Sequence, residues 1–206
     1  MDFLYLLEDL RMPWLDAVVS VLTELGGETV FLVAALVTLW CVDKRRGYYL
    51  LSVCFLGTLV NQFLKITCRV PRPWVRDPNF TIVEAARAEA TGYSFPSGHS
   101  TNSVGTYGVI ATESRNIWVR TVSIALCVLI PLTRLYLGVH TPADVLVGSA
   151  IPLFFLIVLR PVIYRTEEST WASCCWGCWH WLRPSWAIWS CSPSPPMWKP
   201  GIWPRP

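Results

Sequence analysis

The sequence predicts an all-α fold, a polytopic bundle of about five membrane helices. Two observations predict this class. Hydrophobic residues make up 53% of the 206 residues and charged residues only 15%, which is a composition typical of membrane proteins. Several apolar runs also approach the roughly 20 residues that a helix needs to cross a bilayer. The small net charge of +3 forms no basic stripe, so no nucleic-acid partner is expected.

The first half of the chain supplies two of the expected spans. Residues 3–24 mix apolar and charged positions and contain Pro13, a pattern that favours an interfacial amphipathic helix. Gly26-Gly27 ends this segment. The apolar run 29–42 then predicts a first membrane span, and the run 47–66 predicts a second.

Polar residues near the end of the second span point to a site. Asn61, Gln62 and Lys65 fall in its last turns, and polar side chains within a membrane usually face a site. Prolines and arginines then interrupt the apolar pattern over residues 67–95, which predicts a loop with one helical turn near 82–89.

The second half supplies three more helices. Residues 97–112 form an unusually polar helix, which must be buried by its neighbours or line a cavity. Apolar spans are expected at 116–132 and 143–164. We therefore assign residues 1–165 to a membrane-embedded domain. Residues 166–206 are rich in Trp, Cys and Pro without a helical or strand period, so this tail is not expected to fold as a domain, and its cysteines do not have zinc-site spacing.

Three polar clusters flank these spans. They are Lys65 with Arg72, then Ser97-Gly98-His99, and finally Arg134 with His140 and Asp144. The first two share one loop, and two predicted crossings separate that loop from the third cluster. Because successive crossings alternate between the two faces of the membrane, all three clusters are expected on the same face.

The basic residues of these clusters and the start of the predicted helix suit the binding of phosphate. Arg72 and Arg134 carry planar guanidinium groups that can bind two phosphate oxygens at once, and Lys65 adds a point charge. Ser97 and Gly98 begin a predicted helix, where backbone N–H groups and the helix dipole attract anions. A glycine there also lets the backbone approach the ligand closely.

The two histidines suit the chemistry of phosphate transfer, because an imidazole can act as nucleophile, base or acid near neutral pH. His140 precedes Thr141-Pro142, which predicts a helix start with Asp144 in its first turn. Asp144 can then orient the His140 ring and stabilise its imidazolium. We expect His140 to be the nucleophile and His99 the general acid for the leaving oxygen.

This combination resembles the type 2 phosphatidic acid phosphatase family, which includes lipid phosphatases, undecaprenyl pyrophosphate phosphatases and vanadium haloperoxidases. Lys65 with Arg72-Pro73 matches its first motif, Pro96-Ser97-Gly98-His99 its second, and Arg134 with His140 and Asp144 its third. The resemblance implies a phosphohistidine intermediate on His140 and acid catalysis by His99, with no metal or other cofactor. It also implies phosphate contacts from Lys65, Arg72, Ser97, Gly98 and Arg134.

The resemblance covers residues 25–164 and shows two departures. Thr133 stands where the family usually has serine before the arginine, which retains a hydroxyl. Members commonly have six membrane helices, whereas the apolar pattern here accounts for about five, as in a bundle truncated from six or more.

The expected substrate is a lipid phosphate monoester or an isoprenyl pyrophosphate, since a site at the membrane face favours an amphiphile whose tail stays among the membrane lipids. The motifs do not distinguish among these lipids, and the pattern does not indicate an oligomeric state. The alternative is an inactive membrane protein that binds anionic lipid headgroups in the same pocket. It would retain affinity without turnover.

Basic residues outside the motifs predict the orientation of the protein. One group falls on the face opposite the motifs: Lys44, Arg45, Arg46, Arg115, Arg120, Arg160 and Arg165. The motif face is also basic, and the excess falls on the opposite face once Lys65, Arg72 and Arg134 are set aside as ligand-binding residues. Cytoplasmic loops carry an excess of Lys and Arg. We therefore expect an integral protein of the plasma (inner) membrane with an extracytoplasmic active site.

Overall fold

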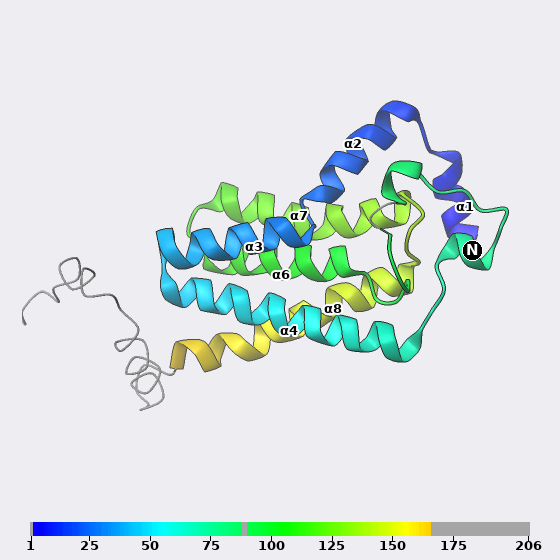
Figure 1. Cartoon of the computed structure of the whole chain (residues 1–206). Coiled ribbons are helices and arrows are strands. Elements are labelled where there is room, and N and C mark those ends of the chain that lie inside the picture. The colour runs from blue at the N-terminus through cyan, green and yellow to red at the C-terminus, as the bar shows by residue number, and fades with distance from the viewer. Residues whose placement is uncertain (1, 88–89, 166–206) are drawn as a thin grey trace, which may run out of the picture. The chain divides into compact units, whose positions relative to one another are not determined.

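The computed structural model describes residues 2–87 and 90–165, and the regular structure of this part is entirely helical (Figure 1). The elements are α1 (Asp2–Asp9), α2 (Pro13–Glu24), α3 (Glu28–Val37), the π-helical η1 (Thr38–Val42), α4 (Lys44–Cys68), α5 (Pro73–Arg76), the 3₁₀ turn η2 (Glu84–Ala86), α6 (Gly98–Glu113), α7 (Ile117–Tyr136) and α8 (Pro142–Arg165). The predicted all-α class is confirmed. The prediction for the tail, 166–206, lies outside the described residues.

Three of these helices, α4, α7 and α8, are each long and apolar enough to cross a membrane. The helix α2 and the continuous α3–η1 segment meet at a bend of 43° and together form a fourth candidate span. Residues 3–24 were expected to form one helix but form two, α1 and α2. The chain breaks before Pro13 because a proline has no N–H to donate and is best accommodated in the first turn of a helix.

The bend between α2 and α3 lies against the helices that carry the second and third motifs. A Cβ atom on Gly26 would lie 2.6 Å from Cγ2 of Ile130 on α7 and 3.2 Å from the carbonyl oxygen of His99 on α6. Only glycine allows this approach without a shift in α6 or α7. The bend is therefore part of the bundle core.

Close packing around α6 explains how so polar a helix can sit in the bundle. α6 packs against α3, α4 and α7, and most of its residues are buried. A Cβ on Gly105 would lie 2.9 Å from Sγ of Cys54 on α4, and one on Gly108 would lie 2.5 Å from Cδ1 of Leu156 on α8. Small residues at such positions let membrane helices approach closely.

A group of buried side-chain hydrogen bonds joins α4, α6 and α8. Nδ2 of Asn61 donates to Oγ1 of Thr101 at 2.9 Å, and that hydroxyl lies 2.9 Å from the carbonyl oxygen of Gly148 and 3.0 Å from that of Ser97. Asn61 therefore faces the interior of the bundle. Gln62, by contrast, is exposed, so the prediction for it was wrong: neighbouring residues on a helix point about 100° apart.

Ionic contacts join the same three helices at their other end. Glu113 at the end of α6 accepts a hydrogen bond from the Tyr164 hydroxyl at 2.6 Å, and its carboxylate lies 3.7 Å from Nε of Arg46 and 3.5 Å from Nε of Arg160. Arg46 lies in the first turn of α4, whereas Lys65 lies in its last turn. A basic residue outside the motifs, Arg46, therefore lies at the opposite end of α4 from a motif residue, Lys65.

Candidate active site

The three motif segments meet at the end of the bundle where α4 ends and α6 and α8 begin (Figure 1). Nη1 of Arg72 lies 3.5 Å from Nε2 of His140, and the backbone N–H of Ser97 donates to the carbonyl oxygen of Asp144 at 3.0 Å. A Cβ built on Gly98 would lie 3.9 Å from Nζ of Lys65. The alternation of spans predicted this meeting of residues that lie 33 to 68 positions apart in the sequence.

The start of α8 places His140 beside Asp144. Pro142 is the first helical residue. The N–H of Thr141 donates to Oδ2 of Asp144 at 2.8 Å, and the N–H of Asp144 lies 3.4 Å from Oγ1 of Thr141. This reciprocal cap is the helix start that the sequence predicts. It leaves Oδ2 of Asp144 3.5 Å from Nδ1 of His140, with each residue only 2% exposed.

Ser94 completes the surroundings of this carboxylate, and the sequence analysis missed it. Its side chain is fully buried, and its hydroxyl donates to Oδ2 of Asp144. Its backbone N–H donates to the carbonyl oxygen of Val70 at 2.8 Å, two residues before Arg72. Ser94 thus links the loop after α4 to the start of α8. A single serine in an irregular loop carries no periodic signal that would reveal this role.

Ser97 caps the first turn of α6. Its Oγ accepts a hydrogen bond from the N–H of Ser100 at 3.4 Å, and the two serine hydroxyls lie 2.9 Å apart. Gly98 is the first helical residue and His99, which is partly buried, the second. The predicted helix start is confirmed, and Gly98 lies in the first turn, where a helix favours an anion.

Backbone carbonyls hold Arg72 in place before any ligand binds. Its guanidinium donates to the carbonyl oxygens of Thr91 at 2.7 Å, Gly92 at 3.1 Å and Val139 at 3.2 Å, and it lies 5.5 Å from the ring centroid of Trp74. A guanidinium has five N–H groups, so these three contacts leave further donors on a group whose orientation is already fixed.

Arg134 lies inside α7, whereas the sequence analysis ended that helix at residue 132. α7 continues to Tyr136, which places Arg134 in its last turn with 1% exposure. Nη1 of Arg134 donates to Oγ1 of Thr23 at 2.9 Å. α7 extends beyond residue 132 because Thr23 provides a polar partner for Arg134. A charged residue ends an apolar run in the sequence, but a helix can continue past that residue when another helix provides a hydrogen-bond acceptor.

The electrostatics of the site favour a neutral His140. Burial, opposed by Asp144 and assisted by the positive charges of Arg72 and Arg134, lowers the pKa of His140 to about 4. A neutral imidazole has a free electron pair on one nitrogen. Lys65, Arg72 and Arg134 contribute three positive charges against the single negative charge of Asp144, which suits a doubly negative phosphate.

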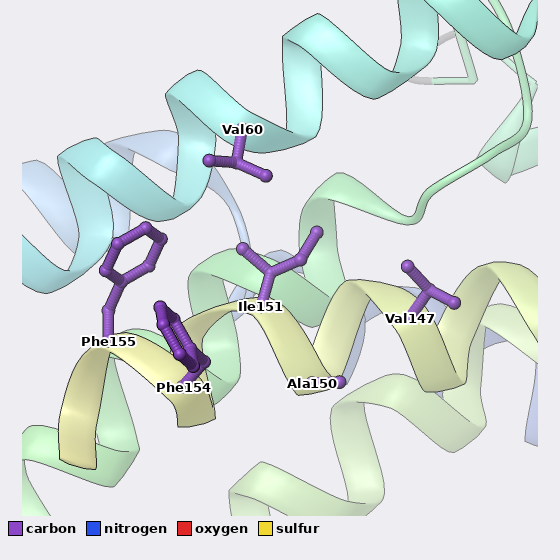
Figure 2. A pocket seen from close by; sticks show the side chains of 6 residues that line it. All are labelled: Val60, Val147, Ala150, Ile151, Phe154 and Phe155. Atoms are coloured by element: carbon purple, nitrogen blue, oxygen red, sulfur yellow. The ribbon is translucent and has the colours of Figure 1, made fainter. Parts of the chain in front are cut away.

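An apolar groove of about 360 Å³ lies between α4 and α8 (Figure 2). Val60 projects from α4 toward α8, and Ile151 and Phe155 project from α8 toward α4 (Figure 2). The lining is Val60, Val147, Ala150, Ile151, Phe154 and Phe155. Val147 follows Asp144 by three residues on α8, so the groove begins about one helical turn from the site.

The fold and the site together define a polytopic membrane protein with a cationic, histidine-containing site at one end of its helix bundle. The chain belongs to the PAP2 superfamily, which its sequence matches over residues 46–168. The family resemblance of the motifs is therefore confirmed, and with it the class of membrane lipid phosphatases.

Relatives and a solved structure agree with this assignment. Phosphatidylglycerophosphatase B of Bacillus subtilis is 31% identical over 72% of this chain and 76% of its own length. Undecaprenyl-diphosphatase of Sulfolobus acidocaldarius is 27% identical over 67% of this chain and 66% of its own length. The crystal structure of a transmembrane PAP2-type phosphatidylglycerolphosphate phosphatase from Bacillus subtilis has a similar fold, with a TM-score of 0.65 and 23% identity over 81% of this chain and 85% of that one.

Proposed function

We propose that residues 1–165 form a membrane phosphatase that hydrolyses a lipid phosphate monoester or an isoprenyl pyrophosphate through a phosphohistidine on His140. One observation carries this proposal. His140 is buried with Nδ1 facing the Asp144 carboxylate and Nε2 facing Arg72. An imidazole whose Nδ1–H is held by a carboxylate presents the electron pair of Nε2 to an incoming phosphorus atom.

The proposed reaction has two steps. Nε2 of His140 attacks phosphorus, a P–N bond forms, and the bond between phosphorus and the leaving oxygen breaks while His99 gives that oxygen a proton. Neutral His99 then takes a proton from water, whose oxygen attacks phosphorus and breaks the P–N bond. Inorganic phosphate leaves and His140 is regenerated, so the same two residues serve both steps.

The phosphate oxygens are proposed to bind Lys65, Arg72, Arg134 and the backbone of Ser97-Gly98. The guanidinium of Arg72 is held by three carbonyls and so loses little freedom on binding. Donors fixed in advance stabilise the charge that develops in the transition state without reorganisation. We propose that these cations supply the charge neutralisation that a metal provides in other phosphatases, and that the reaction needs no metal.

An amphiphilic substrate fits the position of the site. The groove between α4 and α8 begins about one turn from Asp144 and has an entirely apolar lining, so the hydrocarbon chain of a substrate can lie there while its phosphate reaches His140. Phosphatidylglycerophosphate and undecaprenyl diphosphate, named by the relatives described above, are both of this kind. We propose a lipid of this class.

The two ends of the bundle support one orientation in the membrane. Arg46 and Arg160 lie together at the end away from the motifs, and an excess of such residues marks the cytoplasmic side. We propose that the site faces the extracytoplasmic side of the plasma (inner) membrane.

Phosphate release in excess EDTA tests the proposed function. The purified protein in detergent is expected to release phosphate from at least one of phosphatidate, phosphatidylglycerophosphate, a sphingoid phosphate or an isoprenyl pyrophosphate, and to act more slowly on a phosphate without a hydrocarbon chain. Binding of the lipids without release by folded protein would instead support the alternative, a non-catalytic binder of anionic headgroups. Loss of release on chelation, restored by a divalent metal, would contradict metal independence.

The His140 ring is expected to titrate far below the ordinary histidine pKa of about 6.5. Burial lowers its pKa to about 4, so the ring stays neutral from neutral pH down to about pH 5. Between pH 6.5 and 4 the unfolded chain binds a proton at this position and the folded chain does not, so the folded state loses stability as the pH falls. Nitrogen-15 NMR of the imidazole, assigned with His140→Gln, measures the midpoint, and a value at or above 6.5 would contradict this description.

A further inference from the structure

The helix α2 reaches the phosphate site although it lies outside residues 46–168, the region that matches the family. Thr23, in its last turn, is 2% exposed. Oγ1 of Thr23 accepts a hydrogen bond from Nη1 of Arg134 at 2.9 Å and lies 3.1 Å from the hydroxyl of Thr133. A side chain from the N-terminal segment therefore binds a guanidinium that the proposed function assigns to phosphate.

Several contacts fix α2 relative to the last turn of α7. The Tyr136 hydroxyl donates to Oδ1 of Asp16 at 2.8 Å, and Nε of Arg11 donates to the carbonyl oxygen of Tyr136 at 3.1 Å. Just beyond Thr23, the position of Gly26 brings the chain against the carbonyl oxygen of His99. The segment from Thr23 to Gly26 is thus held against α7 and the first turn of α6, the two helices that carry Arg134 and His99.

A buried hydroxyl at this position restricts the orientation of the Arg134 guanidinium. The Arg134 side chain is long and flexible, and its charge is almost completely removed from solvent. A hydrogen bond to one end of the guanidinium restricts its rotation and leaves its other N–H groups with a defined direction, and hydrogen bonds to charged groups are stronger than those between neutral groups. Valine has the shape of threonine but cannot accept this hydrogen bond.

We propose that Thr23 is a positioning residue of the phosphate site, whose hydroxyl orients Arg134 for contact with a phosphate oxygen. This inference rests on the proposed function, because it assigns the anion bound by Arg134 to the substrate. It makes α2 a functional part of the active site, beyond its place in the packing of the bundle.

A double-mutant cycle tests the inference. Thr23→Val is expected to lower kcat/KM about tenfold to a hundredfold, the effect of losing one hydrogen bond to a charged group. Thr23→Ser, which keeps the hydroxyl, is expected to stay within about threefold of the unaltered protein. In an Arg134→Lys background the same valine change is expected to have little further effect, because residues that act through one another are not additive.

A matched control separates positioning from packing. Thr38→Val also removes a helix hydroxyl, one that donates to the carbonyl oxygen of Ala34 at 2.7 Å, and is expected to leave kcat/KM unchanged. Equal losses from Thr23→Val in both Arg134 backgrounds, or no loss at all, would overturn the inference. If the valine variant does not fold, Thr23→Ala takes its place in the same cycle.

Binding of inorganic phosphate keeps this test independent of turnover. If the unaltered protein binds phosphate but hydrolyses no lipid, the proposed function fails while the inference is still tested by affinity. Thr23→Val is then expected to weaken phosphate binding about tenfold or more, and Thr23→Ser to restore it. Unchanged affinity in the valine variant would overturn the positioning role on its own.

Discussion

Replacing His140 with alanine is expected to lower phosphate release by at least about 10⁴-fold, because it removes the proposed nucleophile and with it the covalent intermediate. The ring contacts Asp144 and Arg72 only at 3.5 Å, so its removal costs few short hydrogen bonds. Phosphate release and thermal unfolding, measured in the same detergent, should show a folded and inactive protein.

The companion variant His99→Ala separates the two proposed roles. A missing general acid costs about 10²- to 10⁴-fold with a poor leaving group such as a lipid alcohol. The loss should be much smaller for a nitrophenyl phosphate, whose phenolate leaves without a proton. His140→Ala should be inactive toward both. If nitrophenyl phosphate rescued His140→Ala and not His99→Ala, the two assignments would have to be exchanged.

A trapped intermediate provides the decisive observation for this pair. Rapid acid quenching of the unaltered protein with a phosphorus-32 substrate would destroy a phosphohistidine, which is acid-labile, so the quench must be alkaline. Label is expected on the unaltered protein and absent from His140→Ala. Turnover with no label, together with activity in His140→Ala, would point to direct attack by water.

Local signals account for what the sequence predicted well. The apolar runs located α4 and α8, because a helix in lipid must satisfy its backbone and cover itself with apolar side chains. The order Thr141-Pro142 with Asp144 predicted the start of α8, and the reciprocal bonds between Thr141 and Asp144 form that start. Alternation of the crossings then predicted that the motif segments would share one end, without any knowledge of helix packing.

What the sequence could not predict depends on contacts between helices. Arg134 seemed to lie beyond its helix because the acceptor that holds it, Thr23, is 111 positions away. The same is true of Ser94, whose partner Asp144 is 50 positions away. Gln62 and Asn61 have similar polarity and adjacent places in the chain, yet only Asn61 faces Thr101. Polarity predicts that a residue needs a partner, whereas packing decides which partner it meets.

Two glycines at the site are expected to differ in how the addition of one methyl group changes the stability of the protein. A Cβ on Gly148 of α8 would lie 2.6 Å from the carbonyl oxygen and 3.1 Å from the backbone nitrogen of Ser97. Because these are backbone atoms at the cap of α6, α8 and α6 must separate to admit the methyl group. Gly148→Ala is therefore expected to lower stability by about 1–3 kcal/mol and to lower kcat/KM about 100-fold by displacing the second motif.

Gly98, which follows Ser97 in the second motif, is expected to tolerate the methyl group without a loss of stability. The nearest atom to a Cβ there is Nζ of Lys65, at 3.9 Å on a flexible side chain, and alanine is the better helix former. Gly98→Ala should therefore unfold at the same temperature as the unaltered protein or slightly above it. Its kcat/KM should still fall at least about tenfold, because the methyl group would occupy the space between backbone and Lys65 into which the proposed phosphate fits. Thermal unfolding and kcat/KM of both variants test these two predictions. Full activity in Gly98→Ala would show that the phosphate does not approach this backbone. Unaltered stability in Gly148→Ala would show that α8 and α6 can separate at little cost in free energy.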